Sequence, residues 1–557
     1  MTSQLTPRTS RLLLLALASA ALLILSFPSL NQPWAAWVAL VPWLVMLRRA
    51  RGRSAFWWSY LIGLLFFLGS MWWLVHVTII GWIVLCAFLA LYFGIFGWLV
   101  VQTSDFRHQT PVRRRLRSEV WSLMSVMSVP VAWVTLEFAR SHLLSGFGWN
   151  LLAYSQTPWI GLIQFADLTG AWGVSFLIVL VNTALAEGLL ARRRGRDTSR
   201  AAALALLSAV YCVLSAVVYG LWRMPQALAS ATAHVRIAVV QGNIPQEEKW
   251  DEAFQESILS HYESLTRAAA ASQLDLIVWP ETSVPGFFGV DERLSRRVTG
   301  LAAASQRPLL VGSPAAAQPG ALAMTNSAML VDASGRIAGR YDKLHLVPFG
   351  EFIPGERAFP WLRAVLPPIG EFVPGHDYTV FLTSVPGSGF RVPGSNAELE
   401  TRNSKLAFSA LICFEDIFPE LARHFVREGA RLLLVITNDA WFGPTGAAYQ
   451  HAQASTFRAI ELRVPIARAA NTGWSGCIDP AGRWIGSVRD PHGTELFVSG
   501  THTCDLPLSD AASLYLRWGD WFAWLCAAAI LGWLVTRVVT GERCEVRVRT
   551  PPRTLHT

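Results

Sequence analysis

The chain has 557 residues, of which 52% are apolar and 15% are charged, and its formal net charge is +9. An average soluble domain carries about 25% charged residues. The composition therefore excludes a disordered protein, a basic nucleic-acid-binding domain and an ordinary cytosolic enzyme. It predicts that a large part of the chain lies in lipid.

Apolar segments occupy most of the first 225 residues and recur after residue 513. A membrane-spanning helix needs about 20 mostly apolar residues. Eight segments approach or meet this length: 11–28, 33–48, 55–75, 79–101, 119–138, 171–191, 201–222 and 519–538. The sequence predicts a polytopic α-helical membrane domain over residues 1–225 with seven transmembrane helices, and an eighth helix within 513–540.

Arginine clusters alternate with loops that hold few basic residues. The clusters lie at 48–53, 107–117, 192–200 and 537–553, whereas the turns around Asn31 and His76 hold none. Loops rich in Arg and Lys face the cytoplasm. The alternation predicts eight spans, both termini and the basic tail 541–557 in the cytoplasm, and residues 226–512 on the outer face. Removing the first span as a signal peptide would leave an odd number of spans, and no clear cleavage site follows it.

Lysine is rare in this chain. Only Lys249, Lys343 and Lys405 occur among 47 basic residues. A GC-rich genome accounts for most of the bias towards arginine. A lysine kept against that bias can serve where a compact ammonium group with a variable pKa is required.

Residues 226–512 read as an α/β domain, because short β-branched runs alternate with helical patterns. The predicted strands are 235–241, 274–279, 308–312, 328–331, 405–412, 432–437, 466–470 and 476–478. The predicted helices are 252–272, 291–305, 417–429 and 446–462.

Three reactive side chains stand at or near predicted strand ends, where α/β folds place reactive groups. They are Glu281, Lys343 and Cys413. A thiol reacts as its thiolate, a carboxylate can accept the thiol proton, and an ammonium group can stabilise an oxyanion. Together they would form an acyl-transfer site. Taken singly, a buried cysteine is usually a core residue, and a glutamate or lysine usually faces water.

The strings Leu274–Glu281, Gly339–Glu351 and Ala407–Asp416, in this order, resemble the carbon–nitrogen hydrolase (nitrilase) superfamily. The resemblance implies an α-β-β-α sandwich and a Glu-Lys-Cys triad. In that triad Glu281 is the general base, Lys343 supports the transition state and Cys413 is the nucleophile.

The strings Val239–Gln246, Tyr341–Glu351 and Thr437–Gly443 narrow the resemblance to the apolipoprotein N-acyltransferase family. So does the position of the α/β domain between the seventh and eighth predicted spans. Members transfer an acyl chain from a phospholipid to the α-amino group of an apolipoprotein's diacylglyceryl-cysteine, in the bacterial inner membrane with the catalytic domain in the periplasm. The implied scheme is ping-pong through a Cys413 thioester and requires no metal, nucleotide or other cofactor. The implied partners are the phospholipid donor, the apolipoprotein acceptor and the bilayer, with no nucleic acid.

Family resemblance also implies supporting roles for Glu351 and Glu415. Members often carry Tyr at the position of Phe414, and we expect only the backbone N–H of Phe414 to serve the oxyanion. The apolar, proline-rich segment 357–369 is predicted to be a lid that contacts lipid through Phe359, Trp361 and Leu362. The alternative is a buried loop packed on the sheet.

The sequence also leaves other functions open. A membrane-anchored amidase could use the same triad, with water as the second substrate. A transporter is disfavoured, because no repeat and no paired ionisable residues occur within the spans. No cysteine spacing indicates a zinc site. Cys477 and Cys504 could pair in an oxidising compartment, but the sequence does not decide this.

Overall fold

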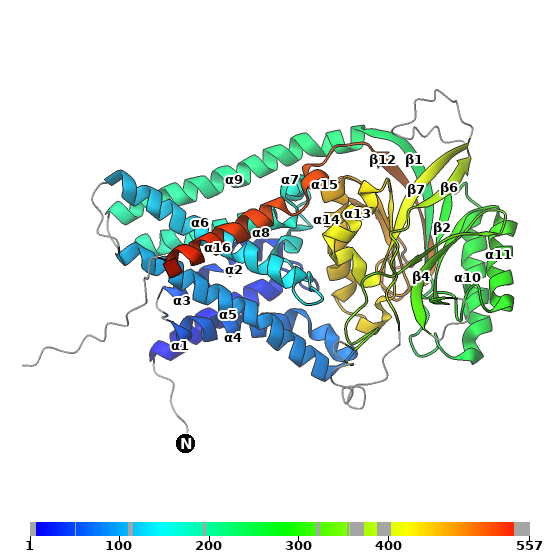
Figure 1. The fold of residues 1–557 in the computed structure, drawn as a ribbon, viewed down its shortest axis with the longest axis horizontal. Helices are drawn as coiled ribbons and strands as arrows, with labels where there is room; N and C mark the ends of the chain where they lie inside the picture. The colour runs from blue at the N-terminus through cyan, green and yellow to red at the C-terminus, as the bar shows by residue number, and fades with distance from the viewer. Residues whose placement is uncertain are drawn as a thin grey trace, which may run out of the picture.

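The computed structural model describes residues 7–48, 50, 52–109, 115–192, 196–318, 323–353, 356, 372–386 and 403–539. Figure 1 shows a bundle of long helices beside a layered α/β part. The chain passes from the bundle into the α/β part once and returns once, through neighbouring strands.

Helices form at all eight apolar segments. They are α1 (Pro7–Leu25), α2 (Ala36–Ala39), α3 (Val41–Leu47), α4 (Arg53–Ser70), α5 (Ile79–Gln109), α6 (Arg115–His142), α8 (Ala171–Ala191), α9 (Arg196–Ala229) and α16 (Trp521–Val539). Within the described residues, four stretches are long and apolar enough to cross a membrane: 79–103, 171–191, 200–229 and 521–539. The apolar stretches Thr9–Leu25 and Pro33–Leu47 are shorter. The count of eight spans therefore stays a prediction.

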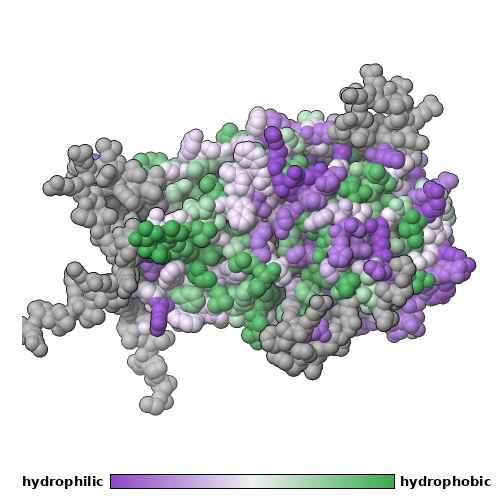
Figure 2. All heavy atoms as spheres, in the orientation of Figure 1, coloured by the Kyte–Doolittle hydropathy of each residue, from purple (hydrophilic) through white to green (hydrophobic). Residues whose placement is uncertain are grey.

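The face of the bundle seen in Figure 2 is mostly apolar. Ile80 is 70% exposed and Leu221 is 69% exposed. Side chains of this kind on long helices are unfavourable in water and are expected where lipid is the solvent.

The α/β part contains two six-stranded sheets, as the α-β-β-α expectation requires. The first sheet has the order β12-β1-β2-β3-β4-β5 and the second the order β11-β10-β9-β8-β7-β6. The first comprises β1 (Ala231–Gln241), β2 (Leu276–Val278), β3 (Leu309–Ala316), β4 (Met324–Val331), β5 (Ile337–Asp342) and β12 (Gly500–Ser509). The second comprises β6 (Phe381–Pro386), β7 (Asn403–Ile412), β8 (Leu433–Thr437), β9 (Ile466–Ala470), β10 (Gly476–Ile478) and β11 (Trp484–Ser487).

Each sheet has parallel central strands and antiparallel edges. The pairs β1–β2, β2–β3, β7–β8 and β8–β9 are parallel. Alternation along β1 assigns its two faces, because successive side chains point to opposite sides of a sheet. Ile237 and Val239 belong to the core that includes both sheets, whereas Ala238 and Val240 face the helical layer on the first sheet.

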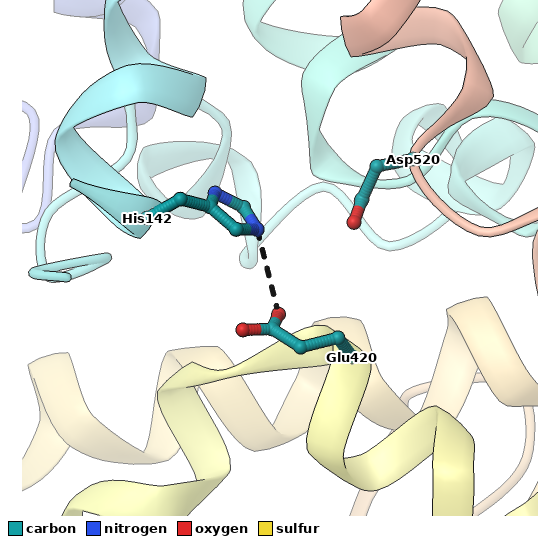
Figure 3. A group of neighbouring side chains, drawn as sticks. All are labelled: His142, Glu420 and Asp520. Atoms are coloured by element: carbon teal, nitrogen blue, oxygen red, sulfur yellow. Dashed lines mark ion pairs between the residues drawn. The ribbon is translucent and has the colours of Figure 1, made fainter. Parts of the chain in front are cut away.

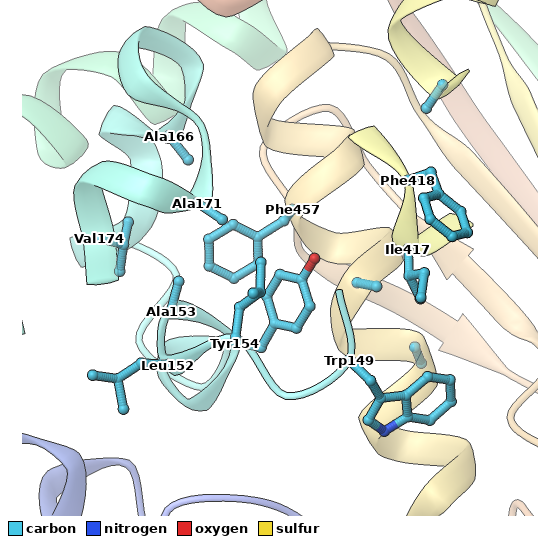
Figure 4. Close-up of a cluster of buried hydrophobic side chains, with 14 of the residues drawn as sticks. Trp149, Leu152, Ala153, Tyr154, Ala166, Ala171, Val174, Ile417, Phe418 and Phe457 are labelled. Carbon is cyan, nitrogen blue, oxygen red and sulfur yellow. The ribbon is translucent and has the colours of Figure 1, made fainter. Parts of the chain in front are cut away.

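Two helical layers cover the sheets. The first sheet carries α10 (Gln255–Ala270) and α11 (Glu292–Ser305), and the second carries α13 (Pro419–Arg427) and α14 (Ala447–Leu462). The bundle packs against α14, and Figure 4 shows Tyr154 of the bundle beside Phe457 of α14, with ring centroids 5.1 Å apart. One continuous core therefore runs from the bundle to the space between the sheets.

Charged contacts close the same junction. The Arg463 side chain, which follows α14, donates from Nη1 to Gln164 Oε1 at 2.8 Å and from Nε to Asp167 Oδ2 at 3.1 Å. Both partners come from the segment between α6 and α8, and Asp167 lies within α7 (Ala166–Thr169). Because all three side chains are buried, the two parts are joined by specific pairing as well as by apolar packing.

A disulfide joins Cys477 of β10 to Cys504 of β12, with their Cα atoms 6.4 Å apart. The bond links the second sheet to the first. The sequence left this pairing undecided, and the structure shows it formed.

Candidate active site

Glu281 stands in a tight turn after β2. Pro280 follows the strand, and Thr282 has a φ of 45°. A Cβ at Gly312 of β3 would collide with the Pro280 carbonyl oxygen and the Glu281 Cα. Glycine at 312 therefore allows this turn to lie directly against the neighbouring strand, which holds the Glu281 backbone in one place.

Lys343 follows β5 and lies between two carboxylates. Its Nζ donates to Glu351 Oε1 at 2.9 Å and lies 3.7 Å from Glu281 Oε1. Asn326 of β4 donates from the same Nδ2 to Glu281 Oε1 at 2.7 Å and to Glu351 Oε1 at 2.9 Å. Lys343 is only 1% exposed. Its ammonium group is therefore fixed by both charge and direction.

The other oxygen of Glu351 closes its own turn. Glu351 Oε2 accepts from the backbone N–H of Val347 at 2.8 Å. The turn includes Phe349, whose φ is 60° and whose side chain is 53% exposed. Glu351 thus joins the Lys343 ammonium to a loop that carries an exposed aromatic ring.

Cys413 begins a short 3-10 helix, Cys413–Ile417, directly after β7. Its φ of 55° is left-handed, an uncommon conformation for a residue with a Cβ. Such strain persists only where surrounding contacts fix it, and it recurs at active sites. The turn places the thiol at the end of a central strand.

The charges of this group act on the Cys413 thiol. Burial and the Glu281 carboxylate raise the pKa of Cys413, whereas the Lys343 ammonium opposes them. Burial alone would lower the pKa of Lys343, but Glu351 and Glu281 outweigh it and raise that pKa. Lys343 is therefore a permanent cation, and the resting thiol keeps its proton until a base removes it.

Glu415 is held by donors from the turns on either side of it. Its carboxylate accepts from the Ile412 backbone N–H at 2.7 Å, the Leu344 backbone N–H at 2.7 Å and the Tyr341 hydroxyl at 2.8 Å. Burial raises the pKa of Glu415 to about 7, against the hydrogen bonds and Lys343. Glu415 therefore links the turn that carries Cys413 to the turn that carries Lys343 through hydrogen bonds. The Phe414 ring contacts Phe147 of the bundle and Phe418.

Two residues of this group were missed by sequence reasoning as site residues. Asn326 lies inside a strand, and no sequence signal singles it out. Lys249 is 3% exposed, and its Nζ donates to the Glu281 backbone carbonyl at 2.9 Å. Burial lowers the pKa of Lys249 to about 8, against the charges of Glu281 and Cys413. The scarcity of lysine was the signal that could have found it.

The loop that carries Lys249 is held by the second sheet. Asn471 Nδ2 donates to the Ile244 carbonyl at 2.8 Å and to Asn438 Oδ1 at 3.1 Å. Asn438 in turn donates to Gln246 Oε1 at 2.8 Å. The string Val239–Gln246 and the string that begins at Thr437 therefore shape one loop. The proposed lid residues Phe359, Trp361 and Leu362 lie outside the described residues.

A different group of ionisable side chains lies at the junction between the two parts (Figure 3). His142, Glu420 and Asp520 bring one ligand atom each within 4.8 Å of one another, as a metal site would need. His142 Nε2 lies 3.8 Å from Glu420 Oε2, and Asp520 Oδ1 accepts from Trp172 and Tyr515. These contacts explain the group as an ion pair and a hydrogen-bonded anchor for α16.

The Glu281, Lys343, Glu351 and Cys413 group has the parts of an acyl-transfer centre. It supplies a nucleophile, a carboxylate that can carry a proton and a fixed cation for a developing oxyanion.

Comparison with known proteins gives separate matches for the helical bundle and for the α/β part. The family profile for the apolipoprotein N-acyltransferase N-terminal domain matches residues 19–184, and the carbon–nitrogen hydrolase profile matches residues 236–513, which contain both sheets except the start of β1. The apolipoprotein N-acyltransferase of Geobacter metallireducens is 38% identical over 532 residues, 92% of this chain and 93% of the relative. That of Chlorobaculum tepidum is 30% identical over 539 residues, 92% and 94% of the two chains. Among solved structures, an amidase of the nitrilase superfamily from Nesterenkonia is 21% identical over 54% of this chain and 97% of its own, with a TM-score of 0.36.

Proposed function

Because this chain belongs to the apolipoprotein N-acyltransferase family, it is an acyltransferase of the membrane, and we propose that it works through a thioester on Cys413. The donor is a phospholipid, and the acceptor is the α-amino group of an apolipoprotein's diacylglyceryl-cysteine. The observation that carries the proposal is the position of Lys343 between two carboxylates, hydrogen-bonded to Glu351 and ion-paired with Glu281, together with the strained turn of Cys413.

In the first half-reaction Glu281 accepts the thiol proton, and the Cys413 sulfur attacks the ester carbonyl carbon of the phospholipid. The oxyanion that forms is stabilised by the Lys343 ammonium and the backbone N–H of Phe414. The carbon–oxygen bond then breaks. Glu281 returns its proton to the departing alkoxide, and the lysophospholipid leaves behind a thioester.

In the second half-reaction the uncharged α-amine of the acceptor attacks the thioester carbonyl. Glu281 takes one amine proton, the carbon–sulfur bond breaks, and Glu281 passes that proton to the departing Cys413 thiolate. The product is an amide. A thioester is already activated towards amines, so the cycle needs no nucleotide.

We assign residues 226–512 to a catalytic domain on the periplasmic face, between a seven-span membrane domain over 1–225 and an eighth span within 513–540. The alternating arginine clusters support this orientation, with both termini in the cytoplasm. The Cys477–Cys504 disulfide also supports it, since structural disulfides persist in oxidising compartments. The segment 357–369 remains our proposed lid, with Phe359, Trp361 and Leu362 as lipid contacts.

A membrane location follows from the substrates as well. Both carry acyl chains, and moving each CH₂ group into water costs about 0.8 kcal/mol. A catalytic centre held against the leaflet avoids most of that cost.

The test is mass spectrometry of the purified full-length protein. The protein is incubated with phospholipid and then with a diacylglyceryl-cysteine peptide. Cys413 should gain one acyl chain, which then moves to the amino group of the peptide. The Cys413→Ala variant should show neither signal.

Two other outcomes would replace the proposal. An adduct that only water removes would indicate a lipid hydrolase on this fold. Cleavage of small amides without any acyl adduct would indicate an anchored amidase.

A further inference from the structure

A second group of buried charged side chains lies next to the turn of Cys413. It takes no part in the acyl-transfer steps described above. His451 of α14 lies at its centre and is 1% exposed. Its Nδ1 is 3.0 Å from Asp439 Oδ1. Its Nε2 is 2.9 Å from Asp416 Oδ1 and 3.2 Å from the backbone carbonyl oxygen of Cys413. All three neighbours are oxygens that accept hydrogen bonds.

This geometry fixes the protonation of the ring. A neutral imidazole has one N–H and one bare nitrogen lone pair, and only the imidazolium has two donors. Both nitrogens of His451 face acceptors, so a neutral ring would set a lone pair against a buried oxygen. A buried acceptor without a donor is strongly disfavoured. The contacts therefore require the doubly protonated ring.

The charges around the ring balance. Asp416 lies in the turn after β7, Asp439 in the turn after β8, and Arg468 on β9. Arg468 Nη1 is 2.5 Å from Asp416 Oδ2, and Arg468 Nη2 is 3.9 Å from Asp439 Oδ2. With His451 charged, two anions face two cations. Burial would lower the pKa of His451, but Asp416 and Asp439 outweigh burial and Arg468 and raise it to about 9.

The network also determines where the Cys413 backbone points. Asp416 follows Cys413 in the same short helix, and its Oδ2 accepts from Ser455 of α14 at 2.6 Å. The Cys413 carbonyl turns inward to His451 Nε2 at 3.2 Å, while its φ is 55°. A strained turn needs such contacts to persist. Trp149, from the bundle, covers the imidazole with ring centroids 5.1 Å apart and shields it from water.

We propose that His451 is a positioning residue for Cys413, in which an imidazolium ring holds the carbonyl of the nucleophile through Nε2 and is itself anchored to Asp439 through Nδ1. The inference rests on the proposed role of Cys413 and deepens it. The ring touches no substrate. It acts through the backbone of Cys413 and through the positive charge beneath the thiol.

The test is a pair of matched variants in the full-length protein. The amide nitrogen of glutamine reaches the place of His Nε2, so His451→Gln keeps a donor for the Cys413 carbonyl. Asparagine reaches only the place of Nδ1, so His451→Asn loses that donor. Both variants remove the charge. The exposed His492, changed to Asn, is the control for handling and folding.

The readout is the rate of Cys413 alkylation by iodoacetamide at pH 7.5, followed by peptide mass spectrometry. We expect alkylation to slow by about 10-fold in H451Q, which loses only the charge, and by about 100-fold in H451N, which also loses the donor to the Cys413 carbonyl. H492N should match the unaltered protein. Equal rates in H451N and H451Q would overturn the proposal, as would wild-type rates in both. Alkylation needs no acyl donor, so a failure here is distinct from a failure of the acyl-transfer proposal.

A second measurement uses the unaltered protein and does not depend on variants that fold. Hydrogen–deuterium exchange at the imidazole C2 position, read by mass spectrometry, follows the protonation of each histidine with pH. His451 should stay protonated past pH 8. A midpoint at or below the ordinary value of about 6.5 would overturn the proposal.

Discussion

The two helical layers of the α/β part have the same place in the fold but different surroundings. On α11 the buried side chains are Leu294, Val298, Leu301 and Ala302, which form one apolar stripe. On α14 every side chain except Tyr449 is buried, including His451, Arg458 and Glu461. Figure 1 shows the reason: α11 lies on the outer side, whereas the bundle covers α14.

This difference shows which helical layer can fix charged side chains in one position. An exposed polar side chain on α11 can hydrogen-bond to water, so it does not need a partner within the protein. A polar side chain on α14 is shielded from water, so it depends on partners within the fold. The nucleophile stands over α14 and not over α11. The layer that docks on the bundle is therefore also the layer that fixes Cys413.

The largest effect should come from breaking a buried ion pair on α14 and comparing it with an exposed pair on α11. Arg458 is unexposed, and its Nη2 is 2.7 Å from Glu461 Oε2. Arg458→Met leaves Glu461 buried without its cation and should lower the free energy of unfolding by about 3 to 5 kcal/mol. Arg296→Met on α11, whose side chain is 73% exposed beside Glu292, should change nothing measurable. Denaturant titration in detergent compares the two variants. Equal stabilities would mean that the bundle does not seal α14.

The next effect concerns the covalent link between the two sheets. Replacing both Cys477 and Cys504 with Ala opens a loop of 27 residues and should lower stability by about 3 kcal/mol. Both sheets should still melt together, because one apolar core contains residues of both. Calorimetry checks this. Two separate transitions in the double variant would show that the disulfide alone coupled the layers.

A smaller effect tests whether buried charge also matters at the Glu281 turn, on the first sheet. Lys249→Gln removes the ammonium charge and leaves a shorter, uncharged amide in its place. We expect acyl-enzyme formation to slow by about 10- to 100-fold. Lys405→Gln is the matched control, because Lys405 is exposed on β7. The burst of acylated protein measures both. A loss of equal size in the two variants would contradict a specific role for Lys249.

The most gradual expected effect is a dependence of stability on pH, which is small over any one pH unit. The pKa of His451 is raised in the folded state above its unfolded value of 6.5. Its contribution to stability is therefore fully present below pH 6.5 and is lost as the pH rises through about 9. The slope is at most about 1.4 kcal/mol per pH unit. Melting temperatures between pH 6.5 and 9 should fall in the unaltered protein and fall less in His451→Gln. Parallel curves would contradict the buried imidazolium.

The limits of several strands and helices with clear apolar patterns were predicted correctly from the sequence. The limits of β9 and β10 are those expected from 466–470 and 476–478, and α11 and α14 start within one residue of their expected positions. Four strands, β5, β6, β11 and β12, were missed. In β12 the buried residues Cys504, Leu506 and Leu508 alternate with polar ones and with Pro507, and proline is tolerated because β12 is an edge strand.

The residues of the candidate site could be predicted only where they lie within a recognisable local sequence motif. Glu281, Lys343 and Cys413 were found through their strings. Asn326 joins Glu281 to Glu351 from inside a strand, and a contact between distant segments leaves no local pattern. Likewise, 446–462 reads as a helix, but the burial of His451 and Arg458 depends on a bundle more than 200 residues earlier.

The pairing of β1 with β12 has a consequence for the order in which the molecule is made. Val240 pairs with Thr501 and Gln241 with Gly500, so the strand that leaves the bundle waits for one synthesised 259 residues later. At about 5 to 20 residues per second, the interval is roughly 13 to 50 seconds. During it, one edge of β1 has no partner, and such an edge invites wrong pairing. Maturation of the catalytic domain must therefore follow, not accompany, the emergence of its first strand.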